Sequence, residues 1–348
     1  MPLSDWYVGR VKKEKTRFDF YVRGLKLAAS KAGCLVAQWR NTLSDRYAIE
    51  DAIIISGMGR GGTTWLTEVF STIPGSGVIW EPLHPIVLRN HHSTRRFQRE
   101  LGNYPYIEED ADWPEAERFF WRLLSGKLLF HEYVKRNMFN PRLARVQRWI
   151  IKFCRANMLL PWLVRKCPVR PIYLLCHPCA VVSSQLRHYG FDVMSDHFNI
   201  PDTRYTKIYR DHRHILPTIK TREQRLAAWW AFDNLIPLQH PANGTAWITV
   251  AYEQLLMSPL DVFSELFSRM GCEVPANMNV IVNKPSRTTD PRAAIAKGQD
   301  QLTSWKSQLS DDQINQILDV VHRFGITAYT DAPEPNYTEL GAIMTTVN

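Results

Sequence analysis

The most informative segment of this sequence is SGMGRGGTTWL, residues Ser56–Leu66. Gly57 and Gly62 have the spacing of a phosphate-binding loop, G-x-x-x-x-G-K-S/T, but Thr63 occupies the position of the usual lysine. The cation of this stretch, Arg60, lies inside the loop instead. Backbone N–H groups of such a loop converge on phosphate oxygens together with a helix N-terminus. The stretch therefore predicts a site that holds a terminal phosphate but is poorly equipped to transfer a γ-phosphoryl group; the alternative is a plain glycine-rich turn.

The loop is flanked by the patterns of a strand and a helix. Residues 52–56 (AIIIS) precede it, and Leu66, Val69 and Phe70 follow at the spacing of one helix face. Further short hydrophobic runs occupy residues 77–80, 149–153, 171–176 and 245–253. Near-continuous hydrophobic strands separated by helices predict an α/β fold, with a central parallel sheet between helices as in the three-layer P-loop NTPase architecture. In such sheets, ligands bind beyond the carboxyl ends of the strands.

Composition sets broad limits on what the chain does. The chain has 348 residues, of which 45% are hydrophobic and 22% charged, as in soluble globular proteins. Its formal net charge of +9 favours an anionic ligand, nucleic acid or an anionic membrane face, or else serves solubility alone. No nucleic-acid-binding module is recognisable, so we expect no nucleic-acid partner. The six scattered cysteines and the lack of a secretory signal predict a cytoplasmic protein.

We expect two parts along the chain. Residues 1–49 form a basic, helical extension, and residues 50–348 form one α/β domain with a helical insert at about 88–148. Residues 6–41 interleave basic and apolar positions. Such a segment either contacts an acidic membrane surface peripherally or packs its apolar side on the domain while water solvates its charges.

The loop also resembles a known family. Residues 60–66, RGGTTWL, resemble the 5′-phosphosulfate loop of the sulfotransferases that use 3′-phosphoadenosine-5′-phosphosulfate (PAPS) as donor. The resemblance implies an enzyme that needs no metal, with Arg60 stabilising the departing 5′-phosphate. It further implies that the donor is held by the loop residues Gly59, Gly61, Gly62, Thr63 and Thr64, with Trp65 beside the adenine.

A second segment carries the resemblance further. Residues 152–186, KFCRANMLLPWLVRKCPVRPIYLLCHPCAVVSSQL, match the family's spacing from a strand lysine to a serine that binds the 3′-phosphate. The resemblance implies that Ser184 is that serine and that Lys152 is a cation near the sulfuryl group. Lys152 could also be a strand-end lysine that reaches solvent. Cys176 stands where the family has an arginine, so a charge-assisted contact with the 3′-phosphate is missing.

Two shorter matches extend the resemblance to about residues 50–325. In VAYEQLL, Tyr252 matches a family position beside the adenine. In AKGQDQLTSW, Lys297 and Gly298 match the family's basic-Lys-Gly element, although Ala296 replaces the leading basic residue. Arg287 could add positive charge nearby.

The proton acceptor is the least determined part of the site. Transfer to a hydroxyl needs a general base within hydrogen-bond reach of that hydroxyl. The histidine of the family's cytosolic branch is replaced here by Cys154, whereas other branches use a carboxylate after the second strand. The sequence VIWEPLHP places Glu81 there, and we take it as the base, with His84 as the rival. Glu81 could instead cap a helix or pair with an arginine.

The sequence thus predicts a sulfotransferase whose acceptor is a hydroxyl of a carbohydrate, glycolipid or other small molecule. The alternatives are a P-loop small-molecule kinase and a catalytically impaired nucleotide-binding protein. The pair Cys176 and Cys179 has the spacing of a redox dithiol, but two buried thiols fit better because the glycine loop has no place in a thioredoxin fold.

Overall fold

The computed structural model describes residues 17–43, 48–84, 88, 94–101, 105–129, 146–188, 191, 210–287 and 300–343. Within these ranges the strands are β1 (Ile53–Gly57), β2 (Ser76–Trp80), β3 (Arg148–Phe153), β4 (Ile172–Leu175) and β5 (Ile248–Ala251). The α-helices are α2 (Arg17–Leu43), α3 (Thr63–Phe70), α5 (Arg95–Leu101), α6 (Pro114–Leu124), α8 (Leu160–Lys166), α9 (Pro178–Leu186), α11 (Arg222–Gln239), α12 (Tyr252–Met257), α13 (Pro259–Arg269), α14 (Met278–Val282) and α15 (Asp311–Arg323). Short 3₁₀ turns lie at Ile49–Asp51, Asn157–Leu159, Leu216–Thr218 and Ser304–Ser307.

The strands form one parallel sheet in the order β2-β3-β1-β4-β5. The glycine-loop strand β1 is central, with Ile55 opposite Lys152 of β3 on one side and opposite Ile172 of β4 on the other. Each of the strands expected from the sequence is present, with ends shifted by a few residues. The predicted α/β class with a parallel sheet is confirmed.

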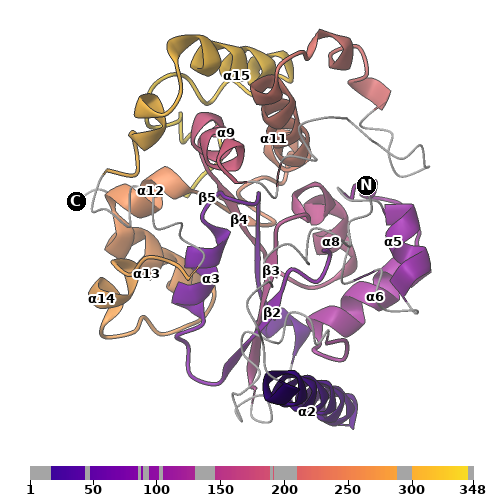
Figure 1. Ribbon diagram of the computed structural model, residues 1–348. Helices are drawn as coiled ribbons and strands as arrows, with labels where there is room; N and C mark the ends of the chain where they lie inside the picture. Colours follow the sequence, from indigo (N-terminus) through magenta and orange to yellow (C-terminus); the bar gives the residue numbers. More distant parts are fainter. Residues whose placement is uncertain are drawn as a thin grey trace.

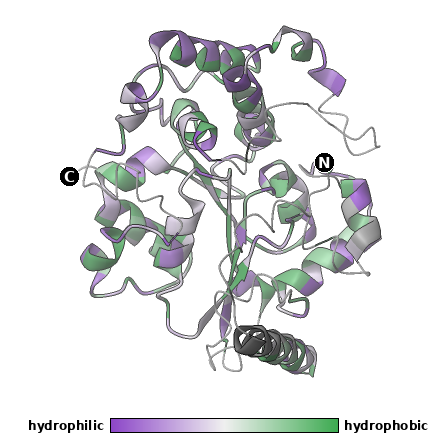
Figure 2. Cartoon of the chain, in the orientation of Figure 1, coloured by the Kyte–Doolittle hydropathy of each residue, from purple (hydrophilic) through white to green (hydrophobic). Residues whose placement is uncertain are grey.

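Helices cover both faces of this sheet. On one face, α3, α12, α13 and α14 pack against alternate strand residues such as Ile53 and Ile55. On the other face, α9, α11 and α15 cover the β4–β5 half, while α2, α5, α6 and α8 cover the β2–β3 half. Figure 1 shows these groups on either side of the sheet. Figure 2 shows hydrophobic residues along the strands, which are buried on both faces as parallel strands usually are.

The helix after the glycine loop shows how sequence pattern becomes packing. Leu66, Val69 and Phe70 of α3 are at most 1% exposed, as their spacing predicts. Phe70 stacks on Phe267 of α13 with ring centroids 4.7 Å apart. This packing fixes the direction of α3, and with it the place of the loop that opens it.

The N-terminal segment contributes one long helix, α2. Among the described residues, no helix is long and apolar enough to cross a membrane. The division into an extension and a domain stays a prediction.

Candidate active site

The candidate site lies at the carboxyl edge of the sheet, where the parallel strands end. Strand β1 leads into the glycine loop and β3 into Cys154. Strand β2 leads into Glu81, β4 into Cys176 and β5 into Tyr252. The topology therefore gathers at one edge residues that are far apart in the sequence.

Two glycines fix the course of the loop. A Cβ atom on Gly57 would lie 2.6 Å from the backbone oxygen of Leu174 in β4. Gly62 has a φ of 90°, and a Cβ atom there would lie 2.5 Å from the ring of Tyr252. The first N–H groups of α3 have no acceptor within the helix, so the loop leads directly into a group of donors suited to an anion. Thr63, at the first position of α3, is buried.

Helix α9 holds the loop through two neighbouring residues. Nε2 of Gln185 donates a hydrogen bond to the backbone oxygen of Gly59 at 3.0 Å. Nε of Arg60 donates to Oγ of Ser184 at 3.1 Å. The structure thus brings together Arg60 and Ser184, which the family resemblance assigns to different phosphates of the donor.

A buried ion pair joins β2 and β3 beside the loop. Nζ of Lys152 lies 2.7 Å from Oε1 of Glu81, and these side chains are 2% and 20% exposed. The same ammonium lies 3.2 Å from Sγ of Cys154, which lies 3.6 Å from Oγ1 of Thr63. A chain of contacts therefore runs from Glu81 to the first residue of α3. Lys152 does not reach solvent, and the partner of Glu81 is this lysine.

The ion pair decides the charge state of the cluster. Burial alone would raise the pKa of Glu81, but the charge and hydrogen bond of Lys152 outweigh burial and lower the pKa to about 2. Burial opposes the charge of Lys152, yet its neighbours Cys154 and Glu81 raise its pKa. Burial, with the charge of Glu81, raises the pKa of Cys154. At neutral pH the cluster therefore holds a carboxylate, an ammonium and an uncharged thiol.

The rival base, His84, lies one turn beyond Glu81. Its backbone N–H donates to the backbone oxygen of Glu81 at 3.0 Å. Burial, together with the charge of Arg155, lowers the pKa of His84 to about 4. The imidazole is therefore neutral at pH 7 and a weaker base than an ordinary histidine.

Backbone strain marks two candidate residues. Within the described ranges, the non-glycine residues with positive φ are Arg60, at 79°, and Glu81, at 45°. Side chains disfavour this left-handed region, and such strain is concentrated at functional sites. The strain therefore favours Glu81 over His84.

The C-x-x-C segment is not built as a redox site. Cys176 and Cys179 are buried free thiols, and burial raises the pKa of both. A reactive dithiol needs an accessible thiol with a lowered pKa. His177, between them, caps α9 by accepting a hydrogen bond from the backbone N–H of Cys179 at 3.1 Å. In the described part of the chain, no group of three or more His, Cys, Asp or Glu side chains is placed to hold a metal.

Behind Cys176 lies a second buried carboxylate, Glu253. It is 3% exposed and accepts a hydrogen bond from the backbone N–H of His177 at 2.8 Å. Burial raises its pKa to about 7, although the hydrogen bond from His177 opposes the shift. Its Oε2 has no hydrogen-bond partner. The sequence pattern gave no sign of this residue's burial.

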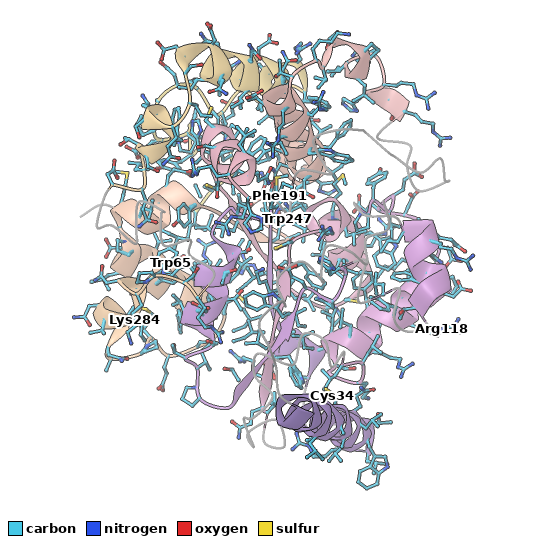
Figure 3. All side chains as sticks on the ribbon, in the orientation of Figure 1. Cys34, Trp65, Arg118, Phe191, Trp247 and Lys284 are labelled. Carbon is cyan, nitrogen blue, oxygen red and sulfur yellow. The ribbon has the colours of Figure 1, made fainter. Side chains whose placement is uncertain are left out.

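A groove of about 500 Å³ runs from Trp65 along α3 toward the segment after α14. Lys284, on its wall, lies on the same side of the molecule as Trp65 (Figure 3). Trp65 is 8% exposed, packs edge-on against Tyr252 and leaves its indole Nε1 without a hydrogen-bond partner. A buried donor without a partner costs free energy, and this N–H lies out of reach of solvent while other atoms of Trp65 line the groove. Arg287, on the rim, is paired with Glu68 at 2.8 Å.

Beneath the loop lies a polar network that the sequence did not indicate. Oγ of Ser56 donates to Oδ1 of Asn157 at 2.6 Å, and Nδ2 of Asn157 donates to Oδ2 of Asp233 at 2.9 Å. Burial raises the pKa of Asp233 to about 7, although the charge of Arg155 opposes the shift. Because Ser56 immediately precedes Gly57, this network supports the start of the loop from α11. Lys297 and Gly298 lie outside the described residues.

Searches against known proteins gave similarities at the level of structure. No family model matches the sequence, and no curated protein matches it. The similar solved structures include mouse sulfotransferase SULT7A1 complexed with PAP, at 15% identity and a TM-score of 0.42, which covers 80% of this chain and 85% of that one. They also include the sulfotransferase domain from the curacin biosynthetic pathway, at 18% identity and a TM-score of 0.40, with 79% and 97% covered.

A third similar structure is the sulfotransferase domain from the Synechococcus PCC 7002 olefin synthase. Its identity is 16% and its TM-score 0.39, and the alignment covers 79% of this chain and 95% of that one.

Proposed function

We propose that this protein is a sulfotransferase that moves a sulfuryl group from PAPS to the hydroxyl of a small acceptor. The observation that carries the proposal is the chain of contacts from Glu81 through Lys152 and Cys154 to Thr63. It places a carboxylate and an ammonium directly beside a phosphate loop that has no lysine of its own. A group-transfer site that accepts a proton from a hydroxyl and neutralises a developing anion needs these parts.

The residues present fit the donor at two places beside the loop. The N–H groups at the start of α3 and the hydroxyls of Thr63 and Thr64 suit its 5′-phosphate. The groove lined by Trp65 suits the adenine, and the ring of Tyr252 lies against the loop at Gly62. Lys297 and Gly298 stay predicted contacts. The donor would supply the sulfuryl group and leave as adenosine 3′,5′-bisphosphate.

The contact of Arg60 with Ser184 can replace the arginine that the family has at position 176. A thiol at Cys176 supplies no charge, and burial raises its pKa. The guanidinium of Arg60 reaches Ser184 at 3.1 Å instead. We therefore assign Arg60 to the Ser184 end of the site, where it supplies the charge that the family places on the next strand.

Glu81 and Lys152 divide the chemistry between them. Glu81 accepts the proton of the acceptor hydroxyl, while Lys152 neutralises charge on the oxygens of the transferring group. With its pKa at about 2, Glu81 is a weak base as long as Lys152 is paired with it. When Lys152 turns toward the transferring group, burial is opposed mainly by the charge of Arg155, and the pKa of Glu81 rises toward the range that suits a general base. Cys154, an uncharged thiol, keeps Lys152 in place in the resting site.

The acceptor proposed is a carbohydrate or glycolipid hydroxyl, since the base position holds a carboxylate rather than an imidazole. A cytoplasmic location is proposed as well. It is supported by the six cysteines, all in the described part of the chain, forming no disulfide, as expected in a reducing compartment.

Calorimetric titration of the protein with adenosine 3′,5′-bisphosphate tests the proposal. We expect binding of the bisphosphate without metal and tighter than binding of ATP with magnesium. A preference for ATP with magnesium would support the kinase alternative and end the sulfotransferase proposal. Binding of the bisphosphate without sulfuryl transfer to any member of a panel of carbohydrate, lipid and phenolic hydroxyls would support the impaired binding protein, which Cys176 makes the stronger alternative.

A further inference from the structure

Helix α2 has an inner face that is anchored to the domain. Cys34 and Ala37 are each 3% exposed. Nδ2 of Asn41 donates a hydrogen bond to the backbone oxygen of Gly126 at 2.9 Å. Figure 3 shows Cys34 on the side of α2 that faces the rest of the molecule. Small and polar side chains therefore attach this helix.

The outer face of α2 carries its large apolar side chains. They are Leu25, Leu35, Val36, Trp39 and Leu43, which are 72%, 65%, 60%, 67% and 66% exposed. At about 100° per residue they fall within one stripe about 100° wide, opposite the inner face. Among the described residues, no large hydrophobic side chain elsewhere is more than 53% exposed. The arrangement is the reverse of the usual one, in which the apolar stripe faces the core.

The same segment concentrates the positive charge of the chain. Residues 1–43 contain nine Lys and Arg against three Asp and Glu, a formal net charge of +6 out of the +9 of the whole chain. The other 305 residues therefore hold only +3. An apolar stripe within a strongly basic segment fits a partner that is both apolar and negatively charged.

We propose that the outer face of α2, defined by Leu25, Leu35, Val36, Trp39 and Leu43, binds the surface of an anionic lipid bilayer. The helix lies in the interface plane, with its apolar side chains below the headgroups and the basic segment among anionic lipids. The exposed indole of Trp39 suits this depth, since tryptophan is enriched at membrane interfaces. A second copy of the chain is a poorer partner because it would bring two segments of +6 together.

The proposal does not depend on the proposed function. In Figure 1, α2 lies at the end of the molecule opposite α9 and the beginning of α3. Membrane binding therefore leaves the candidate active site open, and the two can fail separately.

Sedimentation of the full chain with lipid vesicles tests the proposal. We expect binding to phosphatidylcholine vesicles that contain phosphatidylserine, no binding to phosphatidylcholine alone, and release by salt. The variant Leu35→Ser/Trp39→Ser should bind at least about tenfold more weakly. The matched control Met257→Ser/Leu260→Ser removes side chains that are 53% and 47% exposed elsewhere and should bind as the unchanged protein does. Binding of adenosine 3′,5′-bisphosphate should be equal in all three proteins.

Two outcomes would overturn the proposal. One is the absence of binding to phosphatidylserine vesicles, or binding that the variant in α2 does not weaken. The other is a dimer in light scattering that the same variant converts to a monomer, which would assign the outer face to a second copy.

Discussion

Two carboxylates, one buried and one half-buried, lie at the same edge of the sheet, yet their pKa values move in opposite directions. Glu81 is lowered to about 2, and Glu253 is raised to about 7. Burial favours the neutral acid in both, so the difference comes from the partner. Glu81 has an ammonium 2.7 Å away, whereas Glu253 has the thiol of Cys176 beside it. The side chain beside each carboxylate, Lys152 beside Glu81 and Cys176 beside Glu253, therefore decides the direction in which the pKa of that carboxylate shifts.

The largest effect is expected when the partner of Glu81 is removed. Lys152→Met leaves a buried carboxylate unpaired, so the free energy of unfolding should fall by about 3 kcal/mol. Sulfuryl transfer should fall by more than about a hundredfold, because the transferring group loses its cation. Urea denaturation and initial rates measure both effects. The double variant Lys152→Met/Glu81→Gln should recover more than half of the lost stability, and strictly additive losses would show that the pair is not coupled.

Glu81→Gln tests the base itself. The value of kcat/KM should fall by about 10²–10⁴-fold, because the acceptor proton has no carboxylate to receive it. The dissociation constant of adenosine 3′,5′-bisphosphate, measured by calorimetry, should stay within about threefold because no contact with the product is removed. Glu265→Gln, which removes a surface carboxylate paired with Arg269, is the matched control. A variant at Glu81 that keeps its rate would move the role to His84.

Cys176→Arg tests the other end of the edge. The new guanidinium gains the carboxylate of Glu253 as a partner and adds a cation beside the loop, next to Gly61. The affinity for adenosine 3′,5′-bisphosphate should therefore rise by about tenfold in calorimetry. Cys176→Ser, which adds no charge, should leave the affinity unchanged. Equal affinities in the unchanged protein and both variants would show either that Arg60 already supplies the positive charge for the 3′-phosphate or that no phosphate binds at this end of the site.

The last prediction concerns the pH dependence of stability and involves no change in catalysis or binding. The pKa of Glu253 is about 7 when folded and near 4.5 when unfolded, so the folded state gains stability below pH 4.5 and loses it as pH rises through 7. The change amounts to at most about 3 kcal/mol. Glu253→Gln should flatten this part of the stability profile in urea denaturation. Glu81 contributes the opposite slope, because its stabilisation is present above pH 4.5 and is lost as pH falls through about 2.

The strands, their parallel arrangement and the strand–loop–helix around Gly57 could be predicted from the sequence, because they follow from hydrophobic runs alternating with helical patterns; the order of the strands was not predicted. The contact between Arg60 and Ser184 could not. It depends on how α9 packs over the loop, and the sequence around Arg60 or Ser184 does not show that the two side chains are close. The pairing of Lys152 with Glu81 was equally hidden. The register of β2 on β3 places Trp80 opposite Lys152, which brings the next residue, Glu81, within reach.

The outer face of α2 shows a second limit of pattern reading. The interleaved basic and apolar residues of 6–41 predicted helix, which the structure shows from residue 17 onward, and packing of the apolar side on the domain was the more ordinary expectation. In the structure, Cys34, Ala37 and Asn41 face the domain instead. Small side chains allow a helix to approach the domain closely. Periodicity alone does not show whether the face with small side chains or the face with large apolar side chains will pack on the domain.

The contact between Gly62 and Tyr252 makes two distant positions behave as one unit. With a Cβ atom only 2.5 Å from the ring, no other amino acid fits at 62 unless the aromatic side chain at 252 shrinks or moves. In an alignment of related sequences, the residues at positions 62 and 252 should therefore vary together. An attempt to graft this loop onto another parallel sheet would have to carry the tyrosine with it.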